Sequence, residues 1–352
     1  MKRFLLLLSA IVWIGTPAKG QEAPSAGNYP EFSVIGRTDI NPFSPSVYTL
    51  LEGSIGDLFS YSVSNLWVSD ETSLLYANTF HADELNWLQW AWVQLDLGNF
   101  HIRLGKDCLT AGGFETDAYD FDQHPMLCSN FWNNSQLYQW GGTLSWNTPS
   151  ESDEFGFNYS SSPFSVHPFD DFLTTKTFQW KGEHGPWSSI WGVSVMDYAR
   201  NAEERLKSSI MLVSAGNQFE ITDSFSMGLD YMLRLAGPFV VPPGGSAPAA
   251  AYPYNVGHNV VARINWHPLY WLEVGAKGIF ETSDKEDIEE DLFEIPSMYW
   301  NGGAYLQIYP FKSFEGLRLH AVGGYDNLSG LYWSAGITVN LPVTTLLTGL
   351  GK

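Results

Sequence analysis

The segment LYWSAGITVNL, residues 331–341, decides the fold class that this sequence predicts. Every second residue is apolar: Leu331, Trp333, Ala335, Ile337, Val339 and Leu341. Small or polar residues stand between them: Ser334, Gly336, Thr338 and Asn340. Because successive side chains of a β-strand point to opposite faces, the segment is predicted to be a strand with one apolar and one polar face.

The same alternation recurs along the chain, and charged residues stand in the middle of the predicted strands. The residues between apolar positions include His101 and Arg103, Asp230 and Arg234, Arg263, and Arg318 and His320. A barrel in a membrane presents its apolar residues to lipid and keeps its polar residues in the lumen. A soluble β-sandwich also alternates, since one face of each strand meets water, so alternation alone leaves both architectures open.

The connections between strands favour the barrel. Strand centres are predicted near residues 35, 48, 62, 91, 103, 141, 157, 178, 192, 211, 230, 261, 275, 304, 320 and 336. Long connectors are predicted near 69–84, 108–136, 162–174, 199–206, 236–255 and 282–296. Each is separated from the next by a short one, near 98–99, 147–152, 182–186, 216–223, 267–269 and 310–314. Bacterial barrels sort their connections in this way. The sequence therefore predicts an all-β fold, a transmembrane antiparallel up-and-down β-barrel of about 16 strands, with 14 or 18 as the alternatives.

The first twenty residues have the layout of a secretory signal peptide, with Lys2 and Arg3, an apolar stretch over 4–14 and the small-residue site Ala18-Lys19-Gly20. We therefore expect residues 1–20 to be a signal peptide and residues 21–352 to form a single outer-membrane barrel domain. No later stretch reaches the roughly twenty apolar residues that a membrane-spanning helix requires.

The charge balance and the missing motifs exclude several functions. Without Lys2, Arg3 and Lys19 the chain has 15 basic and 38 acidic residues, a net charge of −23, which argues against nucleic acid as a partner. The sequence contains no Gly-x-Ser-x-Gly turn, no His-Glu-x-x-His pair and no phosphate-binding glycine loop. We therefore expect no cofactor, no metal site and no enzymatic activity.

Cys108 and Cys128 are the two cysteines of the chain. In an exported protein they can form a disulfide within one loop. The alternative is two unpaired thiols, because sequence spacing alone fixes no disulfide geometry.

Two short segments resemble known outer-membrane proteins. Residues 334–341 resemble the C-terminal signal read by the outer-membrane assembly machinery, although this chain continues to Lys352 instead of ending on an aromatic residue. That resemblance implies this machinery and outer-membrane lipid as partners. FHIRLGK at 100–106, followed by GGFE at 112–115, is similar to the strand-to-loop passage of the phosphate-selective porin O and P family.

The porin resemblance implies a homotrimeric diffusion channel in which an inward-folding loop, residues 108–136, narrows the pore. It does not carry over the phosphate preference, which in that family relies on a ladder of lumenal arginines and lysines. Since this chain is strongly acidic, we expect weak cation preference or little selectivity.

The candidate pore-lining and constriction residues are charged residues of the predicted strands and of the loop. They are Arg103, Lys106, Glu115, Asp117, Asp120, Asp122, Asp230, Arg234, Arg263 and Arg318. Loop carboxylates facing wall arginines would create a transverse field that orients polar solutes. In the alternative, the loop carboxylates are solvated outside and the wall charges pair locally across strands.

The sequence thus predicts an outer-membrane porin for passive diffusion of small hydrophilic solutes or ions. The alternative is a closed surface barrel that serves as an adhesin or as a subunit of an outer-membrane complex. A third reading, a secreted soluble β-protein, would fold without detergent.

Overall fold

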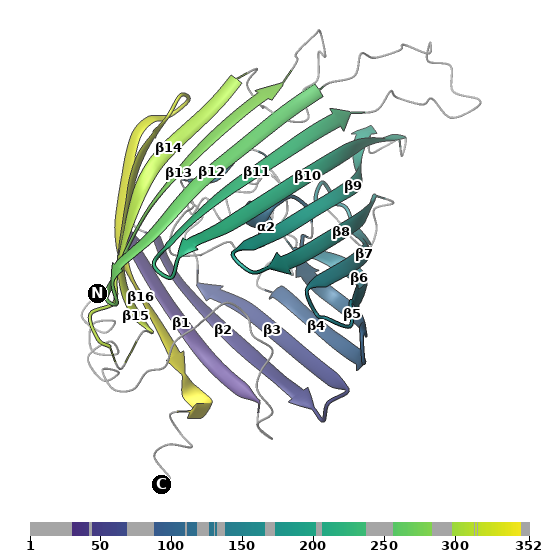
Figure 1. Ribbon diagram of the computed structural model, residues 1–352, viewed down its shortest axis with the longest axis horizontal. Helices are drawn as coiled ribbons and strands as arrows, with labels where there is room; N and C mark the ends of the chain where they lie inside the picture. The colour runs from purple at the N-terminus through teal and green to yellow at the C-terminus, as the bar shows by residue number, and fades with distance from the viewer. Residues whose placement is uncertain are drawn as a thin grey trace.

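The chain folds into a closed antiparallel β-barrel (Figure 1). The computed structural model describes residues 30–41, 44–68, 88–109, 111–117, 127–129, 131, 138–165, 173–201, 206–236, 256–283, 298–312, 314 and 316–345. Each strand pairs with its neighbours in sequence, and β16 pairs with β1 to close the barrel. The sixteen-stranded up-and-down topology predicted from the sequence is therefore confirmed.

All of the predicted strand centres fall within strands. The strands are β1 (Glu31–Ile40), β2 (Ser44–Ile55), β3 (Phe59–Val68), β4 (Leu88–Leu97), β5 (Phe100–Cys108), β6 (Tyr138–Asn147), β7 (Asp153–Ser161), β8 (Thr174–His184), β9 (Trp187–Asn201), β10 (Leu206–Thr222), β11 (Phe225–Ala236), β12 (Val256–Leu269), β13 (Leu272–Ser283), β14 (Met298–Ile308), β15 (Leu317–Asp326) and β16 (Gly330–Pro342). One helical turn, α2 (Phe114–Asp117), follows β5. No helix among the described residues is long and apolar enough to span a membrane.

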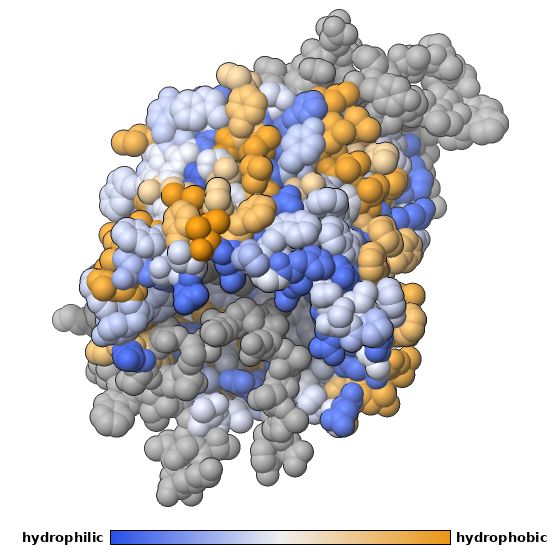
Figure 2. All heavy atoms as spheres, viewed as in Figure 1, coloured by the Kyte–Doolittle hydropathy of each residue, from blue (hydrophilic) through white to orange (hydrophobic). Residues whose placement is uncertain are grey.

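The two faces of the barrel wall differ in polarity, as the alternation predicts. Large apolar side chains are exposed on the outer face, among them Leu104 (57%), Leu229 (50%) and Trp333 (50%). Figure 2 shows apolar residues spread over the outer wall, with hydrophilic residues gathered along the rim nearest the viewer. On the inner face lie serines, threonines, amides and charged residues, because these occupy the alternate positions of the same strands.

The two ends of the barrel differ in the length of their connections. At the turn end, where β1 begins and β16 ends, the strands are joined through 56–58, 98–99, 148–152, 185–186, 223–224, 270–271 and 309–316. At the opposite loop end the connectors over 69–87, 109–137, 162–173, 237–255 and 284–297 are longer. The connector predicted as long near 199–206 is short, because β9 ends at Asn201 and β10 begins at Leu206.

Two of the short connectors predicted at the turn end fall largely inside strands. The connector expected over 216–223 begins too early, because β10 continues to Thr222. The connector expected over 267–269 lies inside β12, which passes Pro268 with a shift of register between Trp266 and Leu269. A bulge of this kind accommodates proline, which cannot donate to the strand ladder.

Candidate functional site

The segment that follows β5 lies inside the barrel, against the inner wall. Leu109 and Phe131 form one buried cluster with inward-facing residues of the wall, including Met196 of β9, Leu212 of β10 and Met232 of β11. These wall positions are apolar where most of the inner face is polar, so they match the apolar side chains of the segment. In Figure 1, α2 is seen within the ring of strands, and it contacts β10 and β11.

Buried charges attach α2 to the wall. Glu115, with 1% of its side chain exposed, accepts a hydrogen bond from Lys277 Nζ of β13 at 2.7 Å, and the same oxygen accepts the Ser129 N–H at 3.0 Å. Asp230 of β11 accepts the backbone N–H of Glu115 at 2.8 Å. One carboxylate of the segment and one of the wall therefore hold the segment in place, and breaking a buried pair of this kind is costly.

A second attachment of the segment lies further along the wall, at β14 to β16. Leu127 is fully buried in a cluster with Tyr305 of β14 and Val322 of β15, and Tyr332 of β16 packs against it. The described parts of the segment thus contact the wall from β9 to β16. They narrow the interior and leave the wall from β2 to β7 as the face opposite the segment.

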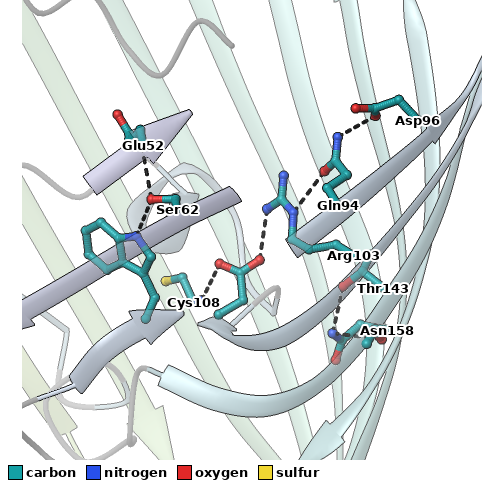
Figure 3. Close-up of polar contacts among 11 residues, drawn as sticks. Glu52, Ser62, Gln94, Asp96, Arg103, Cys108, Thr143 and Asn158 are labelled. Carbon is teal, nitrogen blue, oxygen red and sulfur yellow. Dashed lines mark hydrogen bonds and ion pairs between the residues drawn. The ribbon is translucent and has the colours of Figure 1, made fainter. Parts of the chain in front are cut away.

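A network of polar side chains covers this opposite wall (Figure 3). Arg103 of β5 stacks on the ring of Trp92 at 4.2 Å, donates from Nε to Gln94 Oε1 at 3.0 Å, and pairs through Nη1 with Asp107 at 2.8 Å. The side chains of Arg103 and Asp107 remain 38% and 24% exposed. Aromatic stacking and two hydrogen bonds therefore fix the guanidinium while it still faces the interior.

Charges near this arginine are compensated locally. Asp96 contacts His101 at 2.6 Å and accepts a hydrogen bond from Gln94 at 2.7 Å. Toward β2, Trp90 donates to Ser62 at 2.8 Å, and Ser62 donates to Glu52 at 3.1 Å. The wall is rich in hydrogen-bonding groups without presenting a block of one charge.

The structure places the predicted site residues in different environments. Arg103 lies on the opposite wall, while Glu115 and Asp230 are buried where α2 meets its wall. Arg263 donates to Gln218 at 2.6 Å and lies over the Phe114 ring. By register, Arg234 and Arg318 point inward on β11 and β15. Asp117 is the last residue of α2, and Asp120 and Asp122 lie outside the described residues.

Two of these residues differ from the expectation. Glu115 faces Lys277 instead of an arginine across an open pore, because α2 packs directly on its wall. Lys106 lies opposite Ala91 and Trp140 on the outward register, so it does not share the face of Arg103, and its ammonium donates to the Leu88 carbonyl at 2.7 Å.

The structure does not join Cys108 and Cys128 in a disulfide, the pairing that the sequence had left open. Cys108 ends β5, whereas Cys128 follows Leu127 at the attachment to β14 and β15.

Sequence reasoning missed several charged residues of the interior. Lys277, Asp107 and Asp96 were not among the candidates, and neither was a buried cluster in which Asp39 pairs with Arg37 at 2.7 Å and His320 at 2.6 Å. The same period-two alternation would have placed them on inner faces. Their partners could not be found in this way, because those contacts cross between strands or between wall and loop.

Comparison with solved structures reveals the same architecture at low identity. A porin refined at 1.8 Å resolution is 10% identical, has a TM-score of 0.55, and matches over 89% of this chain and 99% of its own. The chain has the porin fold. The outer membrane channel DcaP of Acinetobacter baumannii is 10% identical with a TM-score of 0.54, covering 89% of this chain and 95% of its own. OmpT, an outer membrane protein of Vibrio cholerae, is 9% identical with a TM-score of 0.57, covering 91% and 99%.

No protein-family model and no curated protein sequence matches the chain. The likeness therefore supports the porin fold, and not the narrower phosphate-selective porin O and P family.

Proposed function

We propose that this protein is an outer-membrane channel through which small hydrophilic solutes and ions diffuse passively. The observation that carries the proposal is the closed barrel of sixteen strands with an apolar outer face and a polar inner face. A barrel of this size is wide enough to hold an aqueous channel, and an apolar outer face suits lipid.

The segment inside the barrel supports a channel of limited width. Its described parts contact the wall from β9 to β16 and leave the polar wall of β2 to β7 uncovered by those contacts. We propose that solutes pass between the segment and this polar wall, where hydroxyl, amide and charged groups replace their hydration.

We further propose weak cation preference or little selectivity. Arg103 and Lys277 each pair with a carboxylate, so within the described residues these two cations do not form a ladder that would select anions. The excess of acidic residues, 38 against 18 basic residues, favours cations slightly. In a salt gradient, the reversal potential should lie close to zero, on the cation-selective side.

A liposome-swelling assay tests passive diffusion. Vesicles containing the purified barrel should swell in isotonic solutions of small sugars and amino acids, and the rate should fall with solute size. The rival function, a closed surface barrel acting as an adhesin or complex subunit, predicts vesicles that incorporate the protein and swell no faster than empty ones.

The assembly we propose is a homotrimer. One structural neighbour is a trimer form of OmpT of Vibrio cholerae, 7% identical with a TM-score of 0.55. Cross-linking of the barrel in native membranes should yield a band at three times the mass of one chain.

A further inference from the structure

A recess opens in the inner wall beside Arg103. Polar side chains of three adjacent strands line it: Arg103, Asp107, Gln139, Thr143, Asn158 and Ser160. Gly105 and Gly141 face each other across β5 and β6 at its centre, so no side chain fills the space. The recess lies in the wall formed by β5, β6 and β7, and Leu109 at the start of the segment lies at its edge.

Arg103 presents a fixed donor edge at this recess. Its Nε and Nη1 atoms are occupied by Gln94 and Asp107, and its plane rests on Trp92. Within the described part of the chain no hydrogen bond from Nη2 is found, and Figure 3 shows this nitrogen pointing away from Gln94 and Asp107. A guanidinium held in this way offers hydrogen bonds at little entropic cost.

Acceptors and a hydroxyl stand next to that donor. Asn158 donates from Nδ2 to Thr143 Oγ1 at 2.9 Å, which leaves its Oδ1 as an acceptor and the Thr143 hydroxyl as a donor. Arg103, Thr143 and Asn158 are direct cross-strand neighbours on β5, β6 and β7, so these groups form one row. The Asp107 carboxylate adds further acceptor capacity beside them.

The charges of this row favour a neutral ligand. Asp107 neutralises Arg103, and the nearest further carboxylate, Asp96, is already bound by His101 and Gln94. An anion would meet two carboxylates, and a cation would meet the guanidinium. A sugar carries adjacent hydroxyls that each donate and accept, which matches a donor edge flanked by acceptors.

We propose that this recess is a binding subsite for neutral polyhydroxylated solutes, namely sugars and sugar alcohols. The proposal deepens the proposed channel function and rests on it for access of the solute. Binding must be weak enough for release, since a site that holds its solute tightly would block passage.

Saturation-transfer NMR on the folded barrel in an amine-oxide detergent tests the subsite without requiring conduction. The probes are glucose, gluconate and protonated glucosamine, which match in size and differ in charge. Glucose should give the strongest transfer, and it should be displaced by excess sorbitol. If gluconate or glucosamine binds more tightly than glucose, the proposal is overturned.

Variants of the recess sharpen the test. R103K keeps the charge but loses the planar donor edge, and it should weaken glucose binding about tenfold, as R103Q should. K207Q removes a cation from β10, a strand that does not line the recess, and should leave glucose binding unchanged. Equal glucose binding by the parent barrel, R103K and R103Q would contradict the assignment.

The Asp107→Asn variant has a readout that a merely structural role would not produce. Removing this carboxylate leaves the Arg103 charge uncompensated, so gluconate should now bind better than glucose, and the reversal potential should shift toward anions. An unchanged order of the three probes would overturn the proposal. A barrel that binds glucose but never conducts would refute the channel function and leave the subsite standing.

Discussion

At the scale of single residues, buried ion pairs decide where the inner segment lies. Glu115 and Lys277 are separated by 162 positions in the sequence, yet their side chains meet at 2.7 Å with 1% and 11% exposure. Removing either charge alone would leave the other charge buried without its counter-charge, which is costly. The position of the segment, and with it the width of the interior, depends on this pair.

Replacing Lys277 with Gln should release the segment from its wall. Loss of one partner of a buried pair costs about 3 kcal/mol, so the detached state should become roughly a hundredfold more populated. Cys128, only 1% exposed, reports the release. In a C108S background, its labelling by a maleimide should accelerate accordingly.

The matched control for this experiment is K207Q. It breaks another lysine–carboxylate pair of the wall, Lys207 of β10 with Asp197 of β9 at 2.8 Å, in which no residue of the segment takes part. Labelling of Cys128 in K207Q should match that of the parent. If K277Q also labels at the parent rate, the ion pair does not hold the segment.

At the scale of strands, a position without a side chain allows β5 to pack closely against the backbone of β4. Gly105 has a φ of +138°, a conformation that side chains disfavour, and a Cβ there would lie 2.8 Å from the Trp92 Cα. Gly156 of β7 differs in both respects, since its surroundings are open within 4 Å and its φ is not positive. The two glycines therefore form a matched pair for substitution.

G105A should destabilise the barrel by about 1–3 kcal/mol because the strained backbone must shift. G156A should leave stability unchanged or raise it slightly. Urea unfolding in lipid vesicles measures both, and equal unfolding midpoints for the two variants would contradict the assigned role of Gly105.

Closure of the barrel depends on a buried cluster that spans the first and last strands. Asp39 of β1 contacts Arg37 on its own strand and His320 of β15, across β16. Gly336 of β16 leaves the room, since a Cβ there would lie 2.6 Å from the Asp39 carboxylate. The carboxylate thus links β1 to β15 at the seam between the first and last strands.

The Asp39→Asn substitution should weaken closure by about 3 kcal/mol, because Arg37 loses its buried counter-charge. The temperature at which the folded band shifts on a denaturing gel should fall. D57N, at the exposed turn between β2 and β3, is the control and should not change that temperature. A parent-like value for D39N would exclude the cluster as a closure element.

The strands could be predicted from sequence because an apolar outer face and a polar inner face impose a period of two along each strand. The failure at 216–223 has a local cause. Glycine is common in turns, but Gly216 lies within β10. Its missing side chain leaves room for the inner segment, since a Cβ there would lie 2.9 Å from the Gly113 Cα. The sequence pattern cannot distinguish a glycine that turns the chain from one that admits a neighbouring segment.

The site could be predicted only in part, for a related reason. Alternation assigns Arg103 and Asp230 to the inner face, but it cannot say which is covered by the segment. Glu115 and Lys277 meet through tertiary packing, and Arg103 is oriented by Trp92 and Gln94 of the neighbouring strand. Partners of this kind depend on strand register and on the path of the loop.

At the scale of the whole molecule, the proposed channel function requires that the outer face meet lipid and the inner face meet water. Leu144 and Thr143 are neighbours on β6, with Leu144 49% exposed on the outer face and Thr143 lining the inner recess. A charge placed at these two positions therefore samples the two environments at nearly the same depth.

Leu144→Arg should destabilise the membrane-inserted barrel by on the order of 2 kcal/mol, the cost of an arginine on the lipid face. Thr143→Arg should cost much less, because its charge remains in the aqueous interior. Unfolding from phosphatidylcholine vesicles measures both variants. Equal losses of stability would mean that the faces are not sorted between lipid and water.

Stepwise conductance in planar lipid bilayers tests directly whether a water-filled passage runs through the barrel. The purified barrel, whose folded state is verified by its heat-dependent gel mobility, should insert and produce discrete current steps in potassium chloride. The steps should be larger in K277Q, in which the inner segment is released. Bilayers that incorporate the folded barrel and stay silent would contradict a water-filled passage through this molecule.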